Sequence, residues 1–86
     1  MDPKIQEIID YIDSLIGEGV PRKVRETFGI VKEKIKTGGE VEITDSIYLL
    51  EEACENVNLA SHIRTEIWSI ISELEKIREE KSVKKQ

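Results

Sequence analysis

The chain has 86 residues, of which 36% are charged, and its formal net charge is −5. This balance disfavours a general nucleic-acid binder or a binder of anionic membranes, because both need a broad basic surface. Aromatic residues make up only 5%, so we expect one small domain with an aliphatic core. The single cysteine, Cys54, cannot close an intramolecular disulfide, and no apolar run approaches the roughly 20 residues of a membrane span. We therefore expect a cytoplasmic protein.

The first predicted helix starts after Asp2, which can cap it, and Pro3 suits its first turn. Gly17 and Gly19 end this helix. Its apolar residues recur at spacings of three and four, which predicts one buried face. These residues are Ile5, Ile8, Ile9, Ile12, Leu15 and Ile16.

Pro21 opens the second predicted helix. Gly38 and Gly39 stop it after a lysine-rich last turn, which suits the negative end of the helix dipole. Its predicted inward residues are Val24, Phe28, Val31 and Ile35.

The third predicted helix starts between Glu40 and Thr44, and residues 56–58 break it. The fourth runs from Ala60 to Glu80. The inward residues of these two helices are Ile43, Ile47, Leu50 and Cys54, and then Ile63, Ile67, Ile70, Ile71, Leu74 and Ile77. Residues 1–80 are therefore predicted to form a single helical domain, and residues 81–86 a polar, flexible tail.

The inward residues of the two halves match at a fixed interval; Val24 and Ile63, for example, are 39 positions apart. The other matches are Ile8 with Ile47, Tyr11 with Leu50, Leu15 with Cys54, Val20 with Leu59, Phe28 with Ile67, Val31 with Ile70, and Ile35 with Leu74. A period near 40 residues is typical of paired-helix repeats of the HEAT and armadillo type. Two ordinary amphipathic hairpins of similar length would give the same pattern. Both interpretations predict an all-α, four-helix domain made of two antiparallel helical hairpins.

Several stretches of the chain resemble a known family. They are Val20-Pro21-Arg22-Lys23-Val24-Arg25, Ser46-Ile47-Tyr48-Leu49-Leu50-Glu51-Glu52, His62-Ile63-Arg64-Thr65-Glu66-Ile67-Trp68 and Ser72-Glu73-Leu74-Glu75. In combination they resemble an archaeal family of uncharacterised small helical proteins, number 0147 of the UPF series. The resemblance implies an archaeal, cytoplasmic, all-helical protein, and it assigns no catalytic residue.

The residue types that carry chemistry are few. His62 is the only histidine, and with Glu66 four residues later it predicts a surface hydrogen bond rather than a zinc site, which needs more ligands. Cys54 lies on the inward stripe, where a thiol is inert. We therefore expect no catalytic, cofactor-binding or metal-binding residue and no enzymatic activity.

Two arginines recur at the repeat interval, and each has a carboxylate twelve residues earlier. Arg25 follows Asp13, and Arg64 follows Glu52. This recurrence predicts an ion pair between the two helices of each hairpin. The alternative is that the arginines contact carboxylates or phosphates of a partner.

Tyr48, Leu49 and Trp68 flank the inward stripes of their helices. Because two repeats lack the neighbours that cover a repeat's outer face, we expect these residues to form a subunit contact in a homodimer. The favoured function is accordingly a non-enzymatic protein-interaction module that associates with itself.

The second helix is basic, with Arg22, Lys23 and Arg25 followed by three lysines, although Glu26 and Glu33 interrupt the charge. The alternative function is therefore an RNA-associated accessory protein that uses this helix. Nucleic-acid binding remains the less favoured prediction, because the sequence has no aromatic set, glycine loop or zinc motif of a known RNA module.

Overall fold

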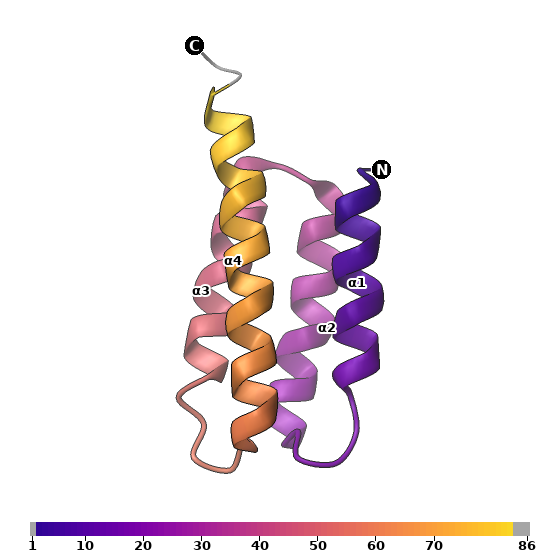
Figure 1. The fold of residues 1–86 in the computed structure, drawn as a ribbon, viewed down its shortest axis with the longest axis vertical. Helices are drawn as coiled ribbons and strands as arrows, with labels where there is room; N and C mark the ends of the chain where they lie inside the picture. Colours follow the sequence, from indigo (N-terminus) through magenta and orange to yellow (C-terminus); the bar gives the residue numbers. More distant parts are fainter. Residues whose placement is uncertain (1, 84–86) are drawn as a thin grey trace.

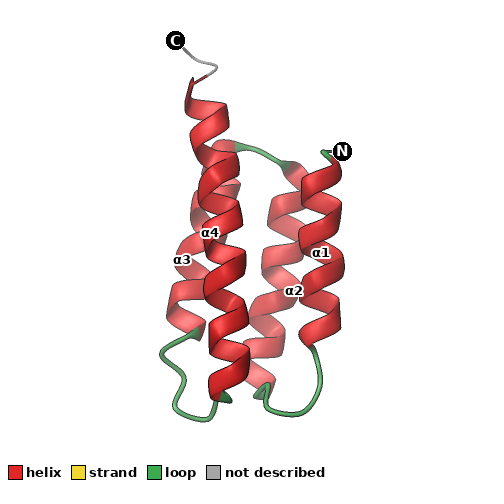
Figure 2. Cartoon of the chain, viewed as in Figure 1, coloured by secondary structure: helices red, strands yellow, loops and turns green. Residues whose placement is uncertain are grey.

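The computed structural model describes residues 2–83, with the side chains of residues 81–83 excepted. In this range the chain forms four α-helices: α1 (Pro3–Leu15), α2 (Arg22–Thr37), α3 (Glu40–Ala53) and α4 (Ser61–Val83). The described residues contain no strand (Figure 2). The all-α prediction is therefore confirmed.

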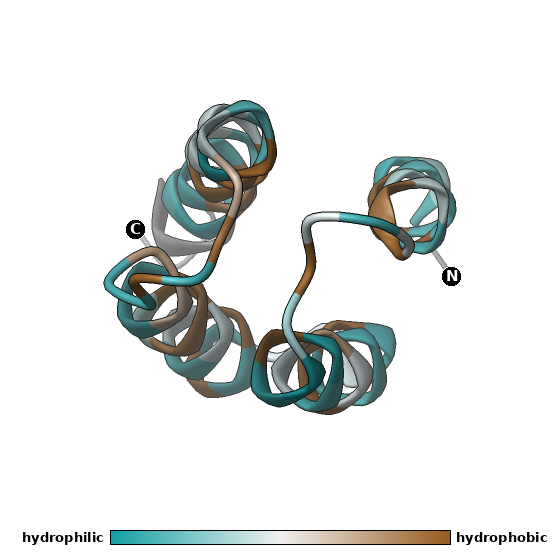
Figure 3. Ribbon diagram, turned by 90° about the horizontal axis from the view of Figure 1, so that it is seen from below, coloured by the Kyte–Doolittle hydropathy of each residue, from teal (hydrophilic) through white to brown (hydrophobic). Residues whose placement is uncertain are grey.

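Consecutive helices run antiparallel (Figure 1). Helices α1 and α4 lie on one side of the molecule, and α2 and α3 lie on the other. Viewed along the helix axes, the four helices surround a common centre (Figure 3). The α2–α3 and α3–α4 pairs pack most extensively, whereas α1 packs less closely against α2. The first helix is therefore the most loosely attached of the four.

The helix ends follow from local chemistry. The carboxylate of Asp2 accepts a hydrogen bond from the backbone N–H of Lys4 at 2.9 Å, which satisfies one free donor of the first turn of α1. Gly38 ends α2 in the left-handed conformation at φ 74°, which a residue without a Cβ adopts readily. Ile16 is extended and lies outside α1, so its prediction as an inward residue was wrong.

The core lies between the helices and is almost entirely aliphatic, with Phe28 fully buried within it. The predicted inward residues of α2, α3 and α4 are all buried, as are Ile5, Ile8, Ile9 and Ile12 of α1. Leu15 is only half-buried. The core also contains one polar residue that the pattern did not predict: Ser46, whose hydroxyl donates to the carbonyl of Glu42 at 2.9 Å.

The α1–α2 and α3–α4 connections meet at one end of the bundle. The backbone N–H of Ala60 donates to the carbonyl of Gly19 at 3.0 Å, and this bond ties the two connections together. Gly19 has φ 86°, and a Cβ at this position would lie 2.8 Å from the Cβ of Ala60. The glycine therefore permits both the turn and the close approach.

At the other end of the bundle, the backbone of α4 continues to Val83. The predicted helical domain ended at residue 80, so residues 81–83 of the predicted tail are helical instead. The remainder of that tail, residues 84–86, lies outside the described residues.

Candidate functional site

Two of the predicted interface residues are exposed. Tyr48 of α3 is 63% exposed and Trp68 of α4 is 48% exposed. Because the two helices run antiparallel from the connection at residues 54–60, each aromatic lies about two turns from that connection. Val41, two turns before Tyr48 on α3, is 66% exposed.

Helical phase places these side chains on the outward-facing sides of α3 and α4. Trp68 lies one turn after Arg64, which bonds to the C-terminal end of α3, so Trp68 leans toward α3 on the outside of the bundle. Tyr48 directly follows the inward Ile47 and projects outward from α3. We call the outer surface of α3 and α4 that carries Val41, Tyr48 and Trp68 the aromatic face.

Leu49 does not belong to the aromatic face. It is partly buried against the core and lines a hollow of about 320 Å³ between α2 and α3, together with Lys34 and Asp45. Tyr48 borders the same hollow. What distinguishes Leu49 from Tyr48 and Trp68, with which it was predicted to form one contact, is its partial burial.

The predicted ion pair between Asp13 and Arg25 does not form. Asp13 of α1 pairs instead with Lys32 of α2. The guanidinium of Arg25 has no hydrogen-bond or ion-pair partner within residues 2–80, where side chains are described. Lys32 lies two turns farther along α2 than Arg25, on the same side of that helix.

The predicted pair between Glu52 and Arg64 is also wrong, because Arg64 has carbonyl partners. Its guanidinium donates to the backbone carbonyls of Cys54 at 2.9 Å, Asn56 at 3.2 Å and Leu59 at 3.5 Å. These carbonyls belong to the end of α3 and the connection to α4, which lack partners within a helix. Arg64 therefore holds the α3–α4 connection in place.

The basic residues of α2 are largely neutralised within the chain. Lys34 approaches Asp45 of α3 at 3.5 Å, Lys36 approaches Glu33 at 3.2 Å, and Lys32 pairs with Asp13. A fourth basic residue, Arg22, lies 3.5 Å from Glu26. Lys23 and Arg25 are the basic residues of this helix that have no such pair within the described side chains.

Cys54 is buried at the end of α3. Burial raises the pKa of its thiol, because the thiolate loses hydration, and the nearby Arg64 opposes this effect only in part. The thiol is therefore protonated and unreactive at neutral pH, as expected for a core cysteine.

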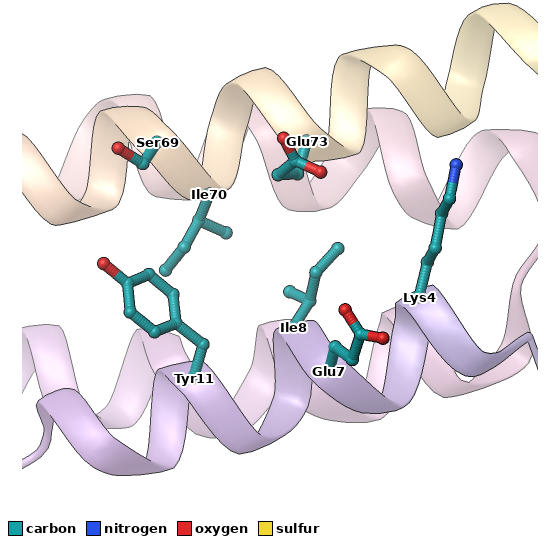
Figure 4. Close-up of a pocket in the computed structure, with 7 residues that line it drawn as sticks. All are labelled: Lys4, Glu7, Ile8, Tyr11, Ser69, Ile70 and Glu73. Carbon is teal, nitrogen blue, oxygen red and sulfur yellow. The ribbon is translucent and has the colours of Figure 1, made fainter.

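A groove between α1 and α4 was not predicted from the sequence. Its first hollow, of about 440 Å³, is lined by Lys4, Glu7, Ile8, Tyr11, Ser69, Ile70 and Glu73. Figure 4 shows Ile8 and Tyr11 extending from α1 toward α4, with Ile70 opposite them. Tyr11 is 37% exposed here. The repeat pattern matched Tyr11 with Leu50, which is buried. The match therefore gave no indication of a groove beside Tyr11.

A second hollow of about 460 Å³ continues from Tyr11 toward the α1–α2 connection. It is lined by Tyr11, Ser14, Leu15, Ile16, Gly17, Glu18, His62, Ile63 and Glu66. The two hollows share Tyr11, so we treat them as one α1–α4 groove. His62 and Glu66 thus border the groove, and no hydrogen bond joins their side chains within the described residues.

Two other kinds of feature are absent from the described part of the chain. None of the described helices is long and apolar enough to span a membrane. Among the residues that the structure describes, no group of three or more histidine, cysteine, aspartate or glutamate side chains is placed to hold a metal ion.

Comparison with known proteins identifies the family. The sequence profile of the uncharacterised protein family UPF0147 matches residues 1–77, and the chain belongs to this family. A UPF0147 protein of Archaeoglobus fulgidus is 40% identical over 76 residues, which cover 85% of this chain and 87% of the relative. A UPF0147 protein of Methanocaldococcus jannaschii is 38% identical over 71 residues, covering 78% of this chain and 76% of the relative. No solved structure matches the chain.

Proposed function

We propose that this protein is a non-enzymatic interaction module of the archaeal cytoplasm that associates with itself through the aromatic face. The observation that carries the proposal is the exposure of three large apolar side chains on the neighbouring helices α3 and α4, those of Val41, Tyr48 and Trp68. Large apolar side chains that gather on one surface mark interaction sites more often than scattered ones do. A buried, reduced Cys54 suits the cytoplasm.

The strength of the proposed self-association can be estimated from the exposed areas of Tyr48 and Trp68. Each presents about half of its roughly 200 Å² side-chain area, so that burying both removes about 200 Å² from water. At about 25 cal/mol per Å² this stabilises an interface by about 5 kcal/mol on each copy. The two copies together contribute about 10 kcal/mol, and association costs at least about 4 kcal/mol. The difference of about 6 kcal/mol corresponds to a dissociation constant of about 40 μM at the tightest.

The charges around the aromatic face oppose this contact. Helical phase places Glu51 and Glu52 of α3 and Glu75 and Glu79 of α4 at its border. A two-fold contact would bring these like charges together across the interface. Salt screens such repulsion, so we expect the dimer to become tighter as the ionic strength rises.

Sedimentation equilibrium over about 10–500 μM, a range that brackets the expected dissociation constant, tests the proposal at low and at high salt. We expect a species of twice 9.9 kDa that tightens with salt. The variants Tyr48→Ser and Trp68→Ser should sediment as monomers, whereas Ile30→Ser, which changes an exposed apolar residue of α2, should not. A wild-type monomer under all these conditions would overturn the proposal.

The RNA-associated alternative has less support, because only Lys23 and Arg25 of α2 stand outside ion pairs in the described part of the chain. A salt titration of binding to bulk RNA tests it. Binding that weakens steeply with salt would favour this alternative, since contacts to phosphates release counterions.

We also propose that the two hairpins arose as a HEAT-like internal repeat. Six of the eight matched pairs are buried in both halves, including Phe28 with Ile67. The pairs that include Tyr11 and Leu15 differ, because both residues border the α1–α4 groove. Superposing residues 5–36 on residues 44–75 tests the repeat, and clearly different crossing angles would reject it.

A further inference from the structure

We propose that the α1–α4 groove is a docking site for a basic amphipathic helix of a partner protein. The groove is separate from the aromatic face, so this inference does not depend on self-association. It rests on the shape of the groove, on its apolar floor and on the charge of its rim.

The shape suits a helix. The groove extends along α1 from Lys4 to Leu15, which at 1.5 Å per residue is about 17 Å, and continues beside the connection as far as Glu18. The two helices that bound it, α1 and α4, run antiparallel (Figure 1). An elongated groove of this kind accommodates a helix of about 14 residues.

The floor supplies apolar contacts at helical spacing. Ile8 and Ile70 form its buried part, where the first hollow lies. Tyr11 is 37% and Ile16 is 40% exposed along the same groove. A partner with apolar residues at positions i, i+3 or i+4, and i+7 would cover both of these side chains.

The charged residues at the rim of the groove indicate which charge a partner should carry. Glu7, Glu18 and Glu66 border the groove without an ion pair in the described part of the chain. Within the described side chains, a fourth carboxylate, that of Glu73, pairs only with Lys76 on its own helix. Lys4, the one lysine of the rim, already approaches Glu80 at 3.5 Å. An apolar helix flanked by lysine or arginine is therefore the complementary occupant.

A synthetic 14-residue peptide with leucines on one face and lysines on the other is a direct probe. Its binding to the full chain can be followed by backbone amide NMR shifts. We expect shifts confined to α1 and α4, and much weaker binding of a peptide with glutamate in place of lysine. A lysine peptide of the same composition, reordered to remove the apolar face, should also bind weakly.

Two matched pairs of variants distinguish binding in the groove from non-specific attraction between the basic peptide and the acidic protein. The double variant Glu7→Gln and Glu66→Gln should weaken binding about three- to tenfold, whereas Glu52→Gln with Glu55→Gln, which changes the net charge equally, should leave it within about twofold. Tyr11→Ala should weaken binding about tenfold. Tyr48→Ala removes an exposed tyrosine of the aromatic face and should leave peptide binding unchanged.

Three results would overturn the proposal. These are no binding at millimolar peptide, equal binding of the lysine and glutamate peptides, and equal effects of the two charge variants. The Tyr48→Ala variant keeps the two proposals apart, since it should abolish self-association and preserve the groove. The glutamine variants change exposed or partly exposed carboxylates without an ion pair in the described chain, so they should fold normally.

Discussion

Replacing Arg64 with alanine should destabilise the protein far more than the same change at Arg25. The two arginines occupy matched positions 39 residues apart, which makes each the control for the other. Arg64 donates to three carbonyls around the α3–α4 connection. Arg25 is exposed, and its guanidinium has no partner within the described side chains.

The magnitude follows from the hydrogen bonds. A hydrogen bond from a charged group contributes about 1.5–3 kcal/mol when it is buried. The bonds of Arg64 to Cys54 and Asn56 are within 3.2 Å but only partly buried. We therefore expect Arg64→Ala to lower the free energy of unfolding by about 2–3 kcal/mol in total. A domain of this size is stable by roughly 4–13 kcal/mol, and such a loss lowers the Tm by about 10–20 °C.

Urea and thermal unfolding, followed by circular dichroism, measure the difference. Arg25→Ala should change the free energy of unfolding by no more than about 0.5 kcal/mol. The free energy of unfolding of Arg64→Lys should lie between those of the wild type and Arg64→Ala. One ammonium group cannot reach all three carbonyls as the guanidinium fork does. Equal effects of Arg64→Ala and Arg25→Ala would refute the assignment of Arg64 as the residue that holds this connection.

Two further predictions concern single positions. Gly19→Ala should lower the free energy of unfolding by about 1–3 kcal/mol, because φ is 86° and the new Cβ meets Ala60; Gly17→Ala, with nothing within 4 Å, should be nearly neutral by urea unfolding. Burial raises the pKa of the Cys54 thiol, so the unfolded chain loses this proton first as the pH rises. The stability that Cys54 contributes is therefore complete below about pH 9 and declines above it, and an equal decline in Cys54→Ala would contradict this reasoning.

The sequence by itself determined the four helices and most of the core. Apolar spacing is a local property of the chain, and one buried stripe per helix follows from it without knowledge of the neighbours. The predictions for α2, α3 and α4 were therefore confirmed residue by residue. Those for α1 were wrong or incomplete at Leu15 and Ile16, where the helix ends and the chain turns away from the core.

Only the tertiary structure decided the partners of the charged residues and the place of the groove. Arg25 and Arg64 have similar local sequences, yet only Arg64 lies beside a connection whose carbonyls need donors. Tyr11 directly precedes the buried Ile12, so it lies at the edge of the inward stripe of α1, whereas its match Leu50 is fully buried. Its place beside the α1–α4 groove follows only from how these two helices are arranged. Such outcomes depend on the distance and register between helices, which the spacing of residues along one helix does not specify.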